Sequence, residues 1–227
     1  MSSEVKAIGN CEASASAESE RGILFVISSP SGGGKGTLIR RMLKTVPLLG
    51  YSVSWTTRTP RTGEQNGRDY YFVSPEAFEQ ARERGEFLEW ALVHGHFYGT
   101  SRSVVESEMT KGRDVILEID VQGAASVRLC MLNAVSVFIL PPSFDILRAR
   151  LLARNSESPA DLERRLRNSR SEVERYGEFD YIVLNDSVER AATQLASIVY
   201  AERARRQRQE LLARRVLATF PETPQVV

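Results

Sequence analysis

"GILFVISSPSGGGKGTLIRR", residues 22–41, joins an apolar run to a glycine-rich turn and then to a segment with helical spacing. Three consecutive glycines let successive backbone N–H groups point inward, and a helix that begins near Lys35 adds its positive N-terminal end to them. A strand, a glycine-rich turn and a helix in this order predict a phosphate-binding loop. The residues of the predicted loop are Ser31, Gly32, Gly33, Gly34, Lys35, Gly36 and Thr37.

One position departs from the common loop pattern G-x-x-x-x-G-K-[ST]. The residue after Lys35 is Gly36, where the pattern has a hydroxyl group that holds Mg²⁺. Lys35 itself is expected to reach the outer phosphates of a nucleotide. The loop therefore predicts a phosphate site and leaves open how the metal is held.

The composition is ordinary for a soluble globular protein of one domain, with 227 residues of which 42% are hydrophobic and 26% charged. Because the net charge is +1, the global charge favours neither a nucleic acid nor a membrane as partner. Cys11 and Cys130 lie far apart, which fits a reducing compartment. The sequence has no signal-peptide core and no run of eighteen apolar residues, so the predicted location is the cytoplasm.

Short β-rich runs alternate with helical stretches along the chain, as in "GILFVI", "DVILEID", "AVSVFIL" and "DYIVLND". This alternation predicts an α/β fold, with a parallel sheet, helices on both faces and a long C-terminal helix. Between residues 52 and 104, hydroxyl, arginine, aromatic and glycine residues predict an inserted, mostly antiparallel subdomain. The predicted divisions are a disordered tail (1–20), a core (21–51, 105–149 and 171–215), the insertion (52–104), a lid (150–170) and a C-terminal tail (216–227).

A second phosphate site is predicted from Arg58, Arg61 and Tyr70 in the inserted segment. Two guanidinium groups and a phenol that converge suit a phosphate monoester, whose oxygens accept bidentate hydrogen bonds. Arginines in a polar loop are more often simply solvated. The glycine-rich loop favours the functional interpretation, because a nucleotide kinase needs a second phosphate site for its acceptor.

Over residues 22–215 the chain resembles the guanylate kinase family. The matching blocks, in order, are "PSGGGK", "TTRTPRTGEQNGRDYYFV", "FLEWALVHGHFYGTS", "EIDVQG", "FILPPS" and "VLND". The resemblance implies a nucleoside-monophosphate kinase that transfers the γ-phosphoryl group of ATP to GMP, and to dGMP as well, in purine metabolism. It also implies a P-loop core, a GMP-binding insertion and a lid.

The resemblance further implies roles for individual residues. It assigns the GMP phosphate to Arg58, Arg61, Tyr70 and Tyr98, and the guanine to Ser54, Glu89 and Thr100. A carboxylate at Glu89 is complementary to the N1 and N2 donors of guanine, whereas adenine reverses this pattern. The site for ATP is expected to include Asn185 of "VLND" as well as the loop.

Glu118 and Asp120 lie two residues apart in "EIDVQG", so both are expected on one side of the sheet, near phosphates and metal. Asp120 is assigned to GMP binding and catalysis, with capping of the next helix as the structural alternative. The resembled family has Asp where this chain has Glu118. For the lid, the resemblance implies that Arg150, Arg154 and Arg165 stabilise the transferring phosphoryl group, although Ala153 and Asn155 replace the usual glycines.

The predicted cofactor is Mg²⁺, with ATP as co-substrate. The form "GKGT" resembles the loop of adenylate kinases, so we expect Mg²⁺ to be held through water near Thr37, Glu118 and Asp120, with no direct protein ligand. The Thr37 hydroxyl is then expected to donate to an ATP phosphate. His94 and His96 lack a third ligand for a metal site of their own, and the basic stretch 201–215 is predicted to be a solvated helix face.

The sequence thus predicts an ATP:GMP phosphotransferase with ATP and GMP as partners, no nucleic acid and no membrane. Two alternatives remain at this point. One is a non-enzymatic guanylate-kinase-like module that binds proteins, and the other is a kinase for another small phosphorylated acceptor. Lys35 opposes the first alternative, and the guanine-reading set of Ser54, Glu89 and Thr100 opposes the second.

Overall fold

The computed structural model describes residues 21–93, 95–153 and 159–221. The predicted N-terminal tail (1–20) and the end of the predicted C-terminal tail therefore lie outside the described residues.

The core of the fold is a parallel sheet of five strands in the order β2-β7-β1-β8-β9, so the predicted α/β class is confirmed. Strand β1 lies at its centre and pairs in parallel with both β7 and β8. The strands of this sheet are β1 (Leu24–Ser28), β2 (Leu49–Tyr51), β7 (Asp114–Glu118), β8 (Val135–Leu140) and β9 (Tyr181–Leu184). Because parallel strands end at the same edge, the segments that follow β1 and β7 meet there.

Alternate residues of β1 point to opposite faces of the sheet, and both faces are buried. Phe25 and Ile27 pack against α1 (Lys35–Thr45) and α7 (Val188–Arg203) in one hydrophobic cluster. Leu24 and Val26 pack against α3 (Arg102–Thr110) and α4 (Val121–Cys130) in another. All five residues of β1 are buried, which explains why this strand reads as a continuous apolar run in the sequence.

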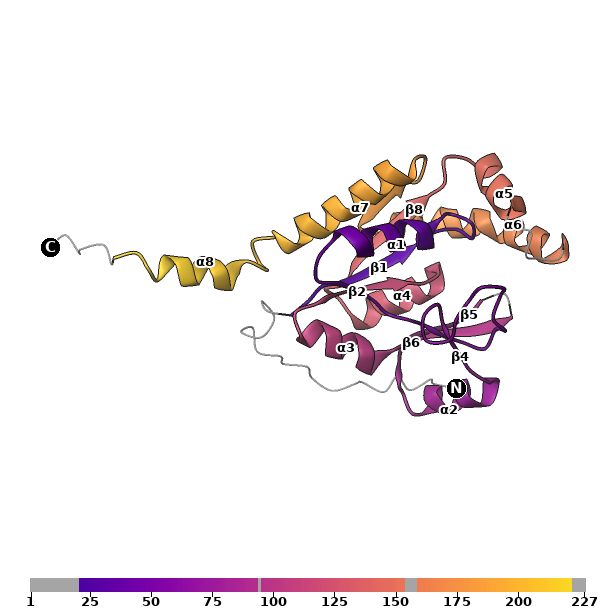
Figure 1. Cartoon of the computed structure of the whole chain (residues 1–227), viewed down its shortest axis with the longest axis horizontal. Helices are drawn as coiled ribbons and strands as arrows, with labels where there is room; N and C mark the ends of the chain where they lie inside the picture. The colour runs from indigo at the N-terminus through magenta and orange to yellow at the C-terminus, as the bar shows by residue number, and fades with distance from the viewer. Residues whose placement is uncertain (1–20, 94, 154–158, 222–227) are drawn as a thin grey trace, which may run out of the picture.

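A smaller sheet lies beside the core, in the order β4-β3-β6-β5. Its elements are β3 (Trp55–Thr56), β4 (Tyr71–Phe72), β5 (Phe87–Val93), β6 (His96–Ser101) and the helix α2 (Pro75–Glu83). β3 and β5 pair antiparallel with β6, whereas β3 and β4 are parallel. Phe78 of α2 stacks on Phe87 and Phe97, which attaches the helix to this sheet. Figure 1 shows this part below the core.

Two helices, α5 (Phe144–Ala153) and α6 (Pro159–Glu174), contain the described residues of the predicted lid and extend beyond its bounds of 150 and 170. They lie together at the upper right in Figure 1. A short 3₁₀ helix, η1 (Arg175–Glu178), leads from α6 to β9.

The prediction of one long C-terminal helix is wrong, because α7 ends at Arg203 and a separate helix α8 (Glu210–Leu217) follows. The chain turns around the buried Glu202, whose carboxylate accepts a hydrogen bond from Tyr181 and forms an ion pair with Arg205. The carbonyl of Arg203 accepts a hydrogen bond from the Gln209 side chain. These contacts stabilise the turn, and α8 projects from the body of the molecule (Figure 1). Among the described residues, no helix has the length and apolar character that would let it span a membrane.

Candidate active site

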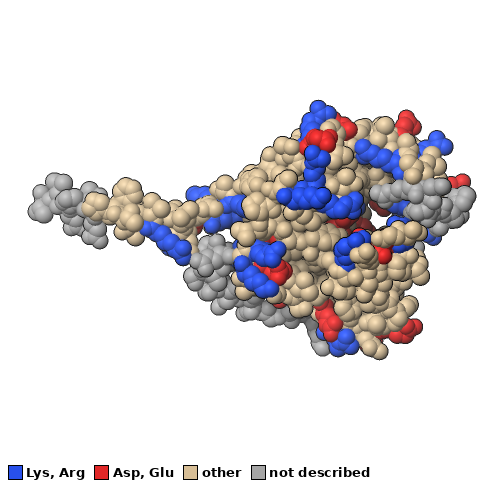
Figure 2. All heavy atoms as spheres, viewed as in Figure 1, with Lys and Arg blue, Asp and Glu red and all other residues tan. Residues whose placement is uncertain are grey.

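A cavity of about 480 Å³ lies where the loop after β1, the smaller sheet and α6 face one another. Figure 2 shows a hollow on the right of the molecule, with Lys and Arg side chains along its border. The predicted site residues that line the cavity are Ser31, Gly32, Gly33, Gly34, Lys35, Gly36, Ser54, Arg58, Arg61, Tyr70, Glu89, Tyr98, Glu118, Asp120 and Arg165. Residues that are far apart in the sequence, from the predicted loop, the insertion and the lid, thus border one space.

The loop between β1 and α1, residues 29–34, is called the glycine loop below. Gly32 and Gly34 have φ values of 87° and 91°, which L side chains rarely adopt. A Cβ atom on Gly34 would lie 2.4 Å from the Asn185 side-chain nitrogen. That nitrogen donates a 2.8 Å hydrogen bond to the Gly33 carbonyl, so Asn185 supports the loop from behind. Glycine is therefore required at position 34 by both backbone conformation and space.

On its cavity side the glycine loop is contacted by Lys35, the residue that follows it, and by helix α6. Lys35 Nζ donates to Ser29 Oγ at 3.2 Å. Arg165 Nε donates to Ser31 Oγ at 2.7 Å, and the Ser31 N–H donates to Glu172 Oε2 at 2.9 Å. Burial raises the pKa of Glu172, while the Ser31 N–H and the charges of Lys35 and Arg165 oppose that rise. The positive charges of Lys35 and Arg165 thus lie near the carboxyl group of Glu172, where the loop meets α6.

The Arg58 side chain is fixed on the opposite wall by hydrogen bonds to a carboxylate and a phenol. Arg58 Nη2 donates to both Glu64 carboxylate oxygens at 3.0 Å, and its Nε donates to the Tyr98 hydroxyl at 3.2 Å. Glu64 Oε2 also accepts the Arg61 N–H at 2.7 Å. Tyr70 packs edge-on against Tyr98 with ring centroids 5.8 Å apart, and Arg58 lies 5.4 Å from the centroid of its ring. The two arginines and two phenols are thereby held around one part of the cavity, a grouping complementary to a phosphate dianion.

Glu89, on β5, is an acid with 5% exposure at the end of the same space. Thr100 Oγ1 donates to Glu89 Oε1 at 2.6 Å. The pKa of Glu89 is raised to about 7, mainly by burial. The Thr100 hydrogen bond opposes this rise, and the charge of Asp120 adds to it. Gly123 makes room for the carboxylate, because a Cβ there would lie 2.6 Å from Glu89 Oε2. This carboxylate can accept hydrogen bonds from two neighbouring N–H groups of a planar base, and the hydroxyl of the buried Ser54 can donate one to the same base.

Glu118 and Asp120 both line the cavity, as their spacing predicts. Asp120 Oδ1 accepts the Gly123 N–H at 3.0 Å, so the capping alternative describes a real contact of this carboxylate. A Cβ on Gly36 would lie 3.5 Å from Glu118 Oε2, which places the longer acid next to the room that a loop hydroxyl would take. Carboxylate oxygens are ligands that suit Mg²⁺, so this donor set fits the ion. In the described ranges, no three His, Cys, Asp or Glu residues group as a metal site of their own.

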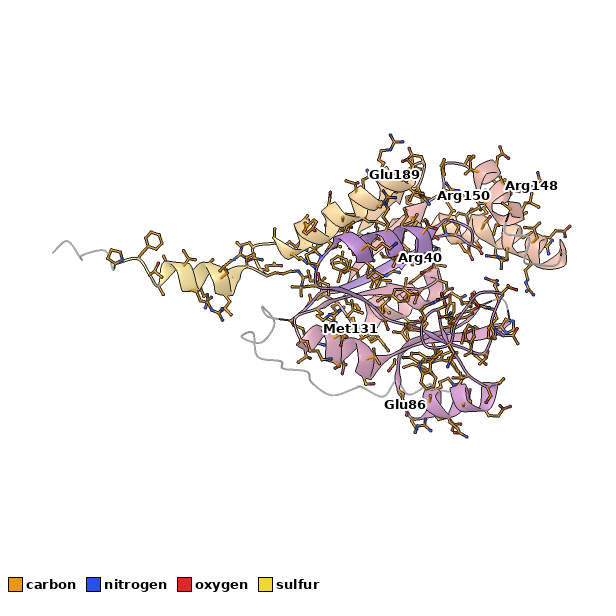
Figure 3. The ribbon with its side chains drawn as sticks, in the orientation of Figure 1. Arg40, Glu86, Met131, Arg148, Arg150 and Glu189 are labelled. Atoms are coloured by element: carbon orange, nitrogen blue, oxygen red, sulfur yellow. The ribbon has the colours of Figure 1, made fainter. Side chains whose placement is uncertain are left out.

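Some predicted site residues lie elsewhere. Thr37 is exposed on α1, and Thr100 is fully buried behind Glu89. Arg150, labelled in Figure 3, belongs to α5 and donates from Nη2 to the Asn185 carbonyl at 2.9 Å. None of these three residues is among those that line the cavity, although Thr100 contacts the lining residue Glu89. Arg154, Asn155 and His94 lie outside the described residues.

Comparison with known proteins decides the family. Residues 21–202 match the family model for guanylate kinase. The chain belongs to the guanylate kinase family. A guanylate kinase of Thermotoga maritima is 50% identical over 185 residues, which cover 82% of this chain and 89% of the relative. A guanylate kinase of Nitrosomonas europaea is 49% identical, covering 87% of this chain and 98% of the relative.

The fold agrees with a member of the family whose structure is solved. The crystal structure of guanylate kinase from Anaplasma phagocytophilum superposes with a TM-score of 0.75 at 34% identity, covering 90% of this chain and 98% of that chain. The α/β architecture with its mostly parallel sheet is therefore the fold of the guanylate kinase family.

Two acidic residues that hold parts of the site were not predicted from the sequence. Glu64 holds Arg58 and the backbone of Arg61. Its signal in the sequence is its place in the "RTGE" block, three residues after Arg61. Glu172 follows Arg165 by seven residues, about two helical turns, so both lie on one face of α6. Such a pair of opposite charges could have been recognised, but its partner Ser31 is 141 positions away.

Proposed function

We propose that this chain transfers the γ-phosphoryl group of ATP to GMP or dGMP, giving ADP and the guanine nucleoside diphosphate. The observation that carries the proposal is the shared cavity, in which a glycine loop at a helix N-terminus faces a second cluster of phosphate-binding groups and a buried carboxylate. A phosphotransferase between two nucleotides needs these three parts within one space. The names of the family's curated relatives support the same activity.

On the acceptor side, Arg58, Arg61, Tyr70 and Tyr98 would bind the GMP phosphate. The bidentate contact with Glu64 supports this role for Arg58, because it fixes the guanidinium group before the acceptor arrives and lowers the entropy cost of binding. The acceptor phosphate is itself the nucleophile and is largely ionised near neutral pH, so the protein needs no covalent intermediate. Positioning its oxygen in line with the donor is the main contribution of these residues.

For the base, the buried carboxylate of Glu89 would accept hydrogen bonds from N1 and N2 of guanine, while Ser54 would donate to O6. The Thr100 hydroxyl already donates to Glu89 Oε1, which orients the carboxylate and supports a positioning role for Thr100. Adenine would leave Glu89 buried without donors, and a mismatch of this kind costs on the order of 10⁴-fold in specificity. This carboxylate therefore favours guanine over the other bases.

On the donor side, the glycine-loop N–H groups and Lys35 would bind the ATP phosphates, with Thr37 donating its hydroxyl to a phosphate. Arg165 would bring positive charge to the transferring group, and Arg150 and Arg154 are proposed to assist it from the lid. Asn185 would act through the loop, which its side chain supports at Gly33. Closure of the lid and the smaller sheet would exclude water, so that ATP is not hydrolysed.

Mg²⁺ is the proposed cofactor, and when bound it would neutralise charge on the phosphate oxygens. Glu118 and Asp120 would orient its water ligands, with Thr37 nearby, and no direct protein ligand is proposed. The donor set and the space beside Gly36 support this arrangement. Purine nucleotide metabolism in the cytoplasm is the setting that the sequence predicts.

The rival function is a non-enzymatic module that binds a phosphorylated peptide in the acceptor site. Lys35 and the intact glycine loop argue against it, since such a module has no use for a donor site. A coupled assay for ADP release with ATP, Mg²⁺ and a panel of GMP, AMP, CMP and UMP tests the proposal. Turnover with GMP well above the other three is expected. Equal turnover of AMP would contradict the guanine assignment, and absence of turnover with all four would favour the module.

A further inference from the structure

Two hydrogen bonds from helix α6 meet at one residue of the glycine loop, Ser31. Arg165 Nε donates to its side-chain oxygen at 2.7 Å, and Glu172 Oε2 accepts its backbone N–H at 2.9 Å. Arg165 and Glu172 are seven residues apart, so about two helical turns separate them and they share one face of α6. The helix therefore holds Ser31 through both its main chain and its side chain.

The other described acids of α6 behave differently from Glu172. Glu163 and Glu174 form ion pairs one turn away on the helix surface, and their side chains are 72% and 63% exposed. Such exposed pairs contribute little to stability. Glu172 instead lines the cavity and accepts a main-chain N–H from another part of the fold. Glu172 therefore has a defined partner in the loop, the Ser31 N–H.

A glycine loop needs such a partner. Gly32, Gly33 and Gly34 give the segment large conformational freedom, and fixing it costs entropy that its own side chains cannot offset. Asn185 holds the Gly33 carbonyl from one side. Glu172 holds the Ser31 N–H from the other side, through a hydrogen bond that is strengthened by the charge of its acceptor. The two contacts hold the loop on either side of Gly32.

The charge of Glu172 argues against a direct part in phosphate binding, because a carboxylate repels phosphate oxygens. Lys35 and Arg165 lie close enough to act on this carboxylate and oppose the cost of its burial. The Glu172 carboxylate accepts the Ser31 N–H beside the loop. Its contribution is made through Ser31.

We propose that Glu172 is a positioning residue that holds the glycine loop, through the Ser31 N–H, in the shape that receives the donor phosphates. The inference rests on the proposed use of this loop for ATP. Loss of the contact should loosen the donor site and leave the acceptor site intact, since Glu172 is not among the contacts of Arg58 or Glu89.

The test compares Glu172→Ala, Glu172→Asp and Glu172→Gln with Glu174→Ala, a control on the exposed face of the same helix. The first readout is hydrogen exchange of the Ser31 amide in the ligand-free protein, and the second is equilibrium binding of a non-hydrolysable ATP analogue and, separately, of GMP. In Glu172→Ala, exchange at Ser31 and the Kd of the analogue should each rise about tenfold, as expected for one charge-assisted hydrogen bond. The Kd of GMP should stay within about twofold.

The conservative variants separate this role from a general packing role. Glu172→Gln keeps an oxygen that can accept the Ser31 N–H but loses the charge, so it should recover part of the analogue binding and of the amide protection. Glu172→Asp keeps the charge but is one methylene shorter, so it should behave like Glu172→Ala, and it carries the test if the alanine variant does not fold. Glu174→Ala should match the wild type in every readout.

Three outcomes would overturn the proposal: unchanged Ser31 exchange in both Glu172→Ala and Glu172→Asp, unchanged analogue binding in both, or equal losses for GMP and the analogue. Failure of the proposed function would look different. It would be a wild-type protein that does not phosphorylate GMP, whereas the exchange of the Ser31 amide needs neither nucleotide nor turnover.

Discussion

Replacing Glu89 by glutamine tests the guanine site with a change of one atom. The side chain has 5% exposure, and Thr100 Oγ1 donates to its Oε1 at 2.6 Å. Glutamine can keep this hydrogen bond through its oxygen. Its amide nitrogen then faces the place where the guanine donors are expected, so that two donors meet instead of a donor and an acceptor.

The expected magnitude follows from the hydrogen bonds that change. A hydrogen bond to a charged group contributes about 1.5–3 kcal/mol, and the variant loses at least one such bond to the base. At about 1.4 kcal/mol for each tenfold change, the KM for GMP should rise by roughly 10- to 100-fold. The KM for ATP should change by less than about twofold, because Glu89 belongs to the smaller sheet and not to the glycine loop.

The raised pKa of Glu89 also predicts how GMP affinity changes with pH. Burial raises the pKa of Glu89 to about 7, so the carboxyl group is largely protonated below that pH. Guanine donors require the ionised form, and GMP affinity should therefore increase up to about tenfold per pH unit below 7 and level off above it. The GMP phosphate titrates near pH 6 as well. The ratio of affinities of wild type and Glu89→Gln, measured by calorimetry between pH 5.5 and about 8.5, removes this shared contribution.

Linkage predicts an opposite trend for stability. The folded state binds more protons than the unfolded state between the ordinary pKa of 4.5 and about 7, so ionisation of Glu89 lowers the free energy of unfolding as pH rises through this window. Denaturant unfolding of Glu89→Gln should lack that decrease. Equal losses of GMP and ATP affinity in the variant, or a flat affinity ratio across the pH range, would refute the reasoning and make Glu89 a structural residue.

Three further substitutions test the other parts of the cavity. Arg58→Ala should raise the KM for GMP by about tenfold or more and also lower kcat, because the guanidinium that binds the acceptor phosphate also aligns it; steady-state kinetics that showed a change in ATP alone would contradict this. Lys35→Ala should reduce turnover by about 100-fold or more while calorimetry without ATP finds unchanged GMP binding, and normal turnover would return the binding module to consideration. Gly36→Ser should shift the Mg²⁺ concentration for half-maximal activity by less than about twofold, since its Cβ fits at 3.5 Å from Glu118 Oε2; a variant that needs far less Mg²⁺ would show that the hydroxyl matters.

Local chemistry explains what could be predicted from the sequence. The apolar run before the glycine loop is buried on both faces of the sheet, and Gly32 and Gly34 have φ values that side chains rarely adopt. Such constraints act within a few residues, so they leave a readable pattern in the chain. Glu118 and Asp120 both line the cavity, as expected from their spacing, although β7 ends at Glu118 and Asp120 is the N-cap of α4.

The long-range contacts could not be predicted from the sequence, because they depend on which distant segments the fold brings together. Glu172 has an ordinary helical sequence around it, and its importance comes from Ser31, 141 residues earlier. The pKa of Glu89 rises through burial, which exists only after the smaller sheet has formed. Helix α7 ends at Arg203, where the buried Glu202 contacts Tyr181 of β9 and Arg205 of the following turn. In each case, removing a charged or polar group from water costs free energy, and a partner that only the tertiary structure supplies offsets part of that cost.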